Sequence, residues 1–218
     1  MLDELRVGRR AAVLVAAAAA AGILAGSIAV YVKQSSKGNG ETAALAACAG
    51  AREAVARVAP LAVGEVAAFR VAEPPHLVGD LAFLAPGGEE TGLAGFAGRT
   101  VLLNLWATWC VPCRTEMPTL DRLEGELGGD YFAVVAVNVD VRNPDGARAF
   151  LDDIAVRRLT FYSDPTTAIF NGLRRRGLAF GLPTTLLIDG KGCLIGVVEG
   201  PAAWDSEDAK KLVRAAIG

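Results

Sequence analysis

Two cysteines separated by two residues, Cys110 and Cys113, are the residues whose type and spacing could carry chemistry. They end the stretch LWATWCVPC, which follows an apolar run. If a helix starts there, its dipole and its free backbone N–H groups stabilise a thiolate at the first turn. We therefore expect Cys110 to be the attacking sulfur. Cys113, one helical turn further on, would resolve the mixed disulfide that Cys110 forms.

Two other uses of this pair are weaker. Half of a zinc site requires a second close pair of cysteines or histidines. The remaining cysteines, Cys48 and Cys193, are far apart, and His76 is the single histidine. A disulfide with a purely structural role is not expected at this spacing at the start of a helix. We therefore expect a redox pair, with no metal and no cofactor.

Cys48 and Cys193 remain as a second pair, and four cysteines is an even number. An exported protein can hold disulfides. We predict a structural disulfide between them that holds an N-terminal helix against the sheet. Two buried free thiols are the alternative.

The N-terminal segment predicts a membrane anchor. Residues 11–32 carry no charge, and about 20 apolar residues are enough to span a bilayer as a helix. Three arginines in residues 1–10 favour a cytoplasmic N-terminus. A signal peptide cleaved near Ala25–Ser27 is the alternative. The rest of the chain is expected outside the cytoplasm, in the periplasm of a bacterium.

The remaining chain predicts an α/β fold with a mixed sheet. Residues 33–72 form a polar tether and one N-terminal helix with Cys48, and residues 73–218 form the domain. Within it, buried runs and strand patterns alternate with helical spacing. The expected helices are 42–59, 113–127, 145–158, one ending near 176 and one capped by Ser206. The expected strands are 100–106, 132–139, 161–163, 184–188 and 193–198, and 61–80 is an extended connector.

The net charge of −2 does not indicate binding to nucleic acid.

The motif WATWCVPCRTEMP (106–118), followed by GLPTTLLIDGKG (181–192), resembles the TlpA/ResA-type thioredoxin-like thiol:disulfide oxidoreductases. The resemblance implies a thioredoxin-like fold with an extra strand and helix in residues 141–176. It also implies a single-pass protein of the bacterial cytoplasmic membrane, with its catalytic domain in the periplasm. Carried over by position, Pro183 is the cis-proline that docks substrate, and Trp109 flanks the two cysteines. Trp106 would flank them too, with core packing as its alternative.

Two positions depart from thioredoxin itself. Asn104 stands where thioredoxin has a buried aspartate, and Glu116 matches a glutamate of ResA-like members. A buried carboxyl there would have a raised pKa and could exchange a proton with Cys113. A solvated helix glutamate is the alternative. In the insertion, Arg174–Arg176 are expected to form a solvated helix end, with docking of an acidic partner as the second interpretation.

The resemblance implies a reductant of protein disulfides. We also expect a monomer that is reduced in turn by a membrane electron donor of unknown identity. Its expected substrates are cysteines of a cytochrome oxidase copper-site protein or a copper chaperone. Reduction of apocytochrome c cysteines is the alternative within the same class. From another class, a Sco-type copper metallochaperone would need three residues between its cysteines and a distal histidine, and a peroxidase an isolated cysteine. Neither pattern is present.

Overall fold

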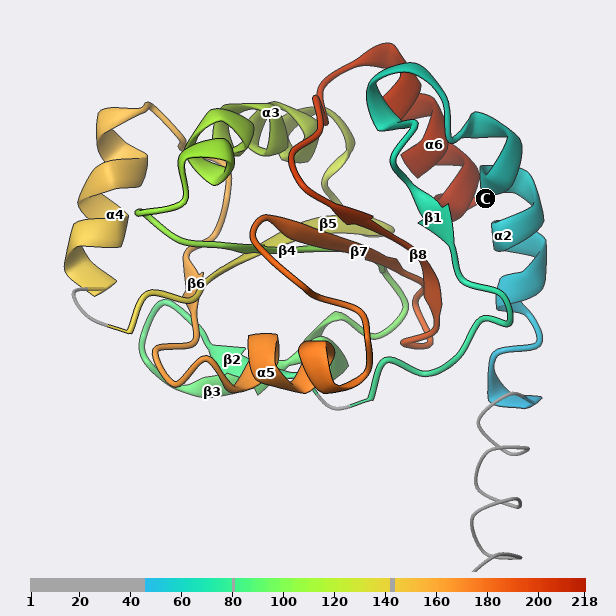
Figure 1. Cartoon of the computed structure of the whole chain (residues 1–218), viewed down its shortest axis with the longest axis horizontal. Coiled ribbons are helices and arrows are strands. Elements are labelled where there is room, and N and C mark those ends of the chain that lie inside the picture. Colours follow the sequence, from blue (N-terminus) through green and yellow to red (C-terminus); the bar gives the residue numbers. More distant parts are fainter. Residues whose placement is uncertain (1–45, 80, 142–143) are drawn as a thin grey trace, which may run out of the picture. The chain divides into compact units, whose positions relative to one another are not determined.

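The structure is a computed structural model that describes residues 46–79, 81–141 and 144–218 (Figure 1). The expected anchor 11–32 and its flanking residues lie outside this part of the chain. Within the described part, no helix is both long enough and apolar enough to cross a membrane.

The described residues form one mixed sheet with the strand order β1-β8-β7-β4-β5-β6-β2-β3. Strand β4 pairs in parallel with β5 and antiparallel with β7, so the sheet changes direction at its centre. Every residue of β4 and β5 is buried, as expected for largely apolar runs covered on both faces. The strands are β1 Arg70–Val71, β2 Ala82–Leu84, β3 Glu90–Gly92, β4 Thr100–Trp106, β5 Phe132–Asn138, β6 Tyr162–Ser163, β7 Thr184–Ile188 and β8 Leu194–Glu199.

Helices cover both faces of this sheet. Figure 1 shows α3 and α6 above the central strands and α5 below them, with α2 beside α6. The fold is therefore the α/β arrangement with a mixed sheet that the sequence predicts. The helices are α2 Ala51–Val58, α3 Val111–Leu127, α4 Pro144–Asp153, α5 Ala168–Arg175 and α6 Glu207–Ile217.

The predicted N-terminal helix is interrupted by a turn. The sequence favours one helix over 42–59; in the described part of that range, Ala46 and Ala47 are helical, residues 48–50 form a turn, and α2 begins at Ala51. Cys48 lies in the turn that precedes α2, since glycine lowers helix propensity at this point. Pro60 does not end the segment; it lies in a short 3-10 helix that continues α2.

The connector 61–80 contributes to the sheet. Arg70–Val71 form β1 and pair with β8 at the edge, which is where a short strand next to prolines is tolerated. The sheet thus includes residues that the sequence assigns to the tether and N-terminal helix segment.

The helix predicted over 145–158 ends earlier. It stops at Asp153 because Ala155 adopts a left-handed conformation with φ 58°. The N–H groups of residues 157–159 then bind the buried carboxylate of Asp121 on α3 at 2.6–3.1 Å. These N–H groups therefore bind Asp121, which lies 36 or more residues earlier in the sequence, instead of carbonyl oxygens of a longer helix.

Candidate active site

Cys110 and Cys113 form a disulfide at the start of α3. Cys110 is the N-cap residue, and its sulfur accepts a hydrogen bond from the Cys113 N–H at 3.2 Å. The positive end of the helix dipole therefore faces the Cys110 sulfur. Cys110 is 5% exposed and Cys113 is fully buried, so Cys110 is the more accessible of the two sulfurs.

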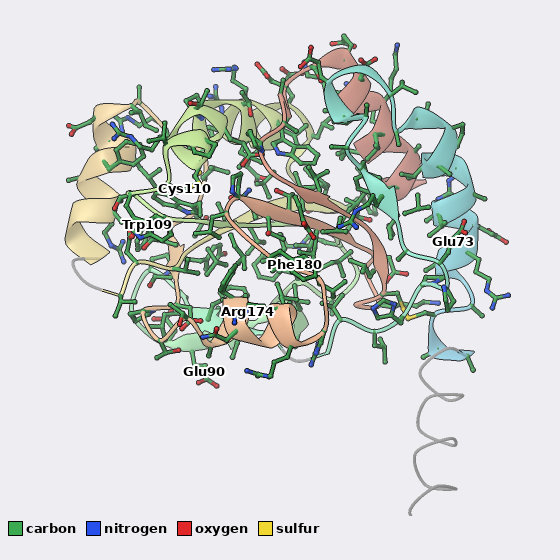
Figure 2. All side chains as sticks on the ribbon, in the orientation of Figure 1. Glu73, Glu90, Trp109, Cys110, Arg174 and Phe180 are labelled. Carbon is green, nitrogen blue, oxygen red and sulfur yellow. A yellow bond between two sulfur atoms is a disulfide. The ribbon has the colours of Figure 1, made fainter. Side chains whose placement is uncertain are left out.

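A buried carboxylate positions the loop before the cysteines. Asp140, which follows β5, accepts a hydrogen bond from the Thr108 N–H at 3.1 Å and another from the Asn138 side chain at 3.0 Å. This contact ties the loop between β4 and α3 to the neighbouring strand. Trp109, beside Cys110 in Figure 2, is 70% exposed. Trp106 is fully buried and packs on Phe150 of α4, which is the core role that the sequence left open.

Pro183 lies at the same end of the sheet as the segment that leads to Cys110. In the antiparallel pairing of β4 with β7, Thr184 at the start of β7 faces Leu105 near the end of β4. The Leu182–Pro183 peptide bond is cis. The topology therefore brings Pro183 and the two cysteines to one edge, although 70 residues separate Pro183 from Cys113 in sequence.

Glu116 is a buried carboxyl one helical turn after Cys113. Its side chain is only 2% exposed, and residues three apart on a helix share a face. Burial raises its pKa from the ordinary 4.5 to about 7 because the charged form loses water. Hydrogen bonds from Trp204, Ala202 and Asn104 stabilise the charged form and oppose that rise.

Asn104, on β4, connects Glu116 to the next strand. Its amide nitrogen donates to Glu116 Oε2 at 3.1 Å and to Thr185 Oγ1 at 2.9 Å. Asn104 is fully buried, and its side-chain oxygen has no partner among the described residues. Asn104 is thus a buried, neutral side chain that contacts the buried acid.

Sequence reasoning missed two residues of this site, Trp204 and Asp140. Trp204 Nε1 donates to Glu116 Oε1 at 2.5 Å across 88 residues of sequence. The available clue for Trp204 was an aromatic side chain with an N–H donor just before a helix cap. For Asp140 it was a carboxylate just past the end of a buried strand.

Cys48 and Cys193 form the second disulfide, away from the first. Their Cα atoms are 5.6 Å apart, and both side chains are buried in a small cluster with Ala51. The bond joins the turn before α2 to the residue before β8. Arg174, Arg175 and Arg176 are all exposed at the C-terminal end of α5.

A family model described as Redoxin matches residues 68–213, a range that includes Cys110, Cys113, Glu116 and Pro183. The chain belongs to the Redoxin family. The match extends from just before β1 into α6, so it includes the sheet and the site of this Redoxin chain.

Two relatives of this Redoxin chain carry names that refer to related chemistry or fold. The thioredoxin-like protein YneN of Bacillus subtilis (strain 168) is 39% identical over 109 residues, 49% of this chain and 60% of YneN. The thiol-disulfide oxidoreductase ResA of Oceanobacillus iheyensis is 34% identical over 115 residues, 52% of this chain and 56% of ResA. In both cases the match spans less than two thirds of the relative's length.

A solved structure has a similar fold. The putative thiol:disulfide interchange protein DsbE from Chlorobium tepidum superposes with a TM-score of 0.56 and 31% sequence identity. The similarity covers 65% of this Redoxin chain and 96% of that protein. The family match and the structural similarity thus agree on the fold.

Proposed function

We propose that the chain is a thiol:disulfide oxidoreductase in which Cys110 is the nucleophile and Cys113 the resolving cysteine. The observation that carries this proposal is the Cys110–Cys113 pair at the start of α3, one helical turn before a buried carboxyl whose pKa is raised to about 7. The names of YneN, ResA and the Chlorobium protein support the same class of reaction.

Reduction of a substrate proceeds in two exchanges. The Cys110 thiolate attacks one sulfur of the substrate disulfide; that bond breaks, and the second substrate sulfur leaves and takes a proton from solvent. A mixed disulfide now joins Cys110 to the substrate. Cys113 then gives its proton to the Glu116 carboxylate, and the Cys113 thiolate attacks the Cys110 sulfur. The bond between Cys110 and the substrate breaks, and the first substrate sulfur leaves and takes a proton from solvent. Two electrons pass to the substrate, and the protein ends in the disulfide form of the structure.

Substrate docking is proposed for exposed apolar side chains on either side of Cys110 and in the loop before Pro183. Trp109 and Val111 are both 70% exposed on either side of Cys110, and Phe180, in the loop before β7, is 68% exposed. Such apolar side chains suit an unfolded or extended protein segment. Pro183 would present its neighbouring backbone to that segment.

We also propose where the protein acts and in which direction it passes electrons. The chain acts as a periplasmic reductant, held to the bacterial cytoplasmic membrane by residues 11–32 and reduced again by a membrane electron donor. Its substrates are cysteines of a cytochrome oxidase copper-site protein or of a copper chaperone. Apocytochrome c cysteines are the second candidate. These points rest on the uncharged N-terminal run and on the resemblance of the motifs, not on the described residues.

The test is a direct comparison of substrates. The reduced full-length chain is mixed with an oxidised copper-site domain of cytochrome oxidase or with oxidised apocytochrome c, and released thiols are counted by alkylation and mass spectrometry. We expect one substrate disulfide reduced per chain, and none with Cys110→Ser. Equal activity of Cys110→Ser would refute the assigned nucleophile, and preference for apocytochrome c would refute the copper-site assignment.

A further inference from the structure

The segment between β8 and α6, residues 200–206, is attached to the face of α3 that carries Glu116. Thr119 accepts a hydrogen bond from the Trp204 N–H at 3.3 Å, and Arg122 forms an ion pair with Asp205 at 2.7 Å. Residues 116, 119 and 122 are spaced by three and lie along one side of α3. The segment is therefore held in place at the Trp204 backbone and at Asp205 by two contacts that do not involve the Glu116 side chain.

The two oxygens of Glu116 have different surroundings. Oε1 accepts hydrogen bonds from the Ala202 N–H at 3.1 Å and from Trp204 Nε1 at 2.5 Å. Among the residues that the structure describes, Oε2 accepts from a single donor, the Asn104 amide nitrogen at 3.1 Å. Trp204 is fully buried, so its N–H has no water to bind instead.

We propose that Trp204 is a positioning residue that, together with the Ala202 N–H, keeps Oε1 an acceptor, so that the exchangeable proton of Glu116 is carried by Oε2. A neutral carboxyl group has one oxygen with a hydrogen and one without. The oxygen that already accepts two N–H groups is the one that remains without it.

Asn104 is suited to follow both states of this proton. When Glu116 is charged, the Asn104 nitrogen donates to Oε2, as in the structure. When Oε2 carries a proton, it needs an acceptor, and the Asn104 oxygen is buried without a partner among the described residues. Rotation of the Asn104 side-chain amide by about 180° exchanges its nitrogen and oxygen and places the oxygen toward Glu116 Oε2. Thr185 tolerates either orientation because its hydroxyl both donates and accepts.

Neutral groups dominate the surroundings of Glu116. Cys113 precedes it on α3, Asn104 faces it from β4 with Thr185 of β7 behind, and Ala202 and Trp204 face it from the segment before α6. In the described part of the chain, Glu116 makes no ion pair, and its pKa is set by burial and these hydrogen bonds. Cys113 is the titratable neighbour, and it is bonded to Cys110 in the oxidised form. The Trp204 N–H stabilises the charged form, so its removal favours the neutral form.

The experiment is a carbon-13 NMR titration of the side-chain carboxyl of Glu116 in the oxidised full-length chain, assigned by its loss in Glu116→Gln. In Trp204→Phe we expect the titration midpoint to rise by about one pH unit, a tenfold change in the ionisation constant. Trp106→Phe is the matched control. Trp106 is equally buried, but its Nε1 has no partner among the described residues, so its removal should leave the midpoint in place.

A second measurement needs no variant at Trp204. In the wild-type chain, the indole N–H resonance of Trp204 should move with the same midpoint as the Glu116 carboxyl. An unchanged midpoint in Trp204→Phe, or an indole resonance that does not follow Glu116, overturns the inference. The inference rests on the proposed function, because the Glu116 proton matters for exchange with Cys113. The titration uses the disulfide form, in which no thiol exchange occurs. A negative titration would therefore not refute thiol exchange by Cys110, and absence of thiol exchange would not refute the titration result.

Discussion

Replacement of Glu116 by glutamine should remove a pH dependence from the stability of the oxidised protein. Glutamine keeps the volume and an acceptor oxygen for Ala202 and Trp204, but it cannot ionise. Its amide nitrogen would face Asn104, whose unpartnered oxygen can accept from it. The variant therefore changes the titration more than the packing.

The magnitude follows from the pKa of Glu116. This pKa is about 7 in the folded chain against an ordinary 4.5, and each pKa unit corresponds to about 1.4 kcal/mol. Between these values the folded chain keeps the proton that the unfolded chain loses, so the free energy of unfolding falls as the pH rises. At 2% exposure, solvent screens this effect little. The wild-type chain should lose about 3 kcal/mol relative to Glu116→Gln between pH 4.5 and pH 7.5.

The assay is urea unfolding of both oxidised proteins at several pH values from 4 to 8. In the disulfide form, neither Cys110 nor Cys113 titrates, so thiol ionisation does not contribute. Glu124, whose pKa is also raised by burial, is present in both proteins and cancels in the difference. If the difference in unfolding free energy between the two proteins stays constant from pH 4 to pH 8, the raised pKa of the Glu116 carboxyl is refuted.

Two further predictions concern stability. Asp121→Ala should lower the free energy of unfolding by about 3 kcal/mol or more, because three backbone N–H groups lose a charged acceptor; Asp121→Asn, which keeps one oxygen, should cost less in the same urea assay. The double variant Cys48→Ala, Cys193→Ala should lose on the order of 5 kcal/mol, as the chain-entropy model gives for a long closed loop. The sulfurs bridge a sequence separation of 145, and an unchanged urea midpoint would contradict this account of the bond.

The central strands and the cysteine motif could be predicted from local sequence alone. The runs at 100–106 and 132–138 are apolar except for Thr100, Asn104 and Asn138, and they become fully buried strands. The start of α3 follows from the Cys-x-x-Cys segment with Pro112 in its first turn. In each case the deciding interactions lie within a few residues, so the pattern of residue types is sufficient.

Contacts between distant residues explain what the sequence missed. The end of α4 depends on the Asp121 carboxylate of another helix, and the state of Glu116 depends on Trp204, 88 residues later. The pairing of β1 with β8 rests on two residue pairs at the edge, too short for any pattern to show. No local spacing encodes such contacts, which become visible only when the fold brings the elements together.

The assignment of Cys110 as the attacking sulfur is tested most directly by trapping. The reduced variants Cys113→Ser and Cys110→Ser are mixed with a small aromatic disulfide, and the mixed disulfides are located by peptide mass spectrometry. We predict that Cys113→Ser accumulates one stable adduct on Cys110, while Cys110→Ser reacts far more slowly because Cys113 is fully buried. An adduct that forms on Cys113 as fast as on Cys110 would contradict the account.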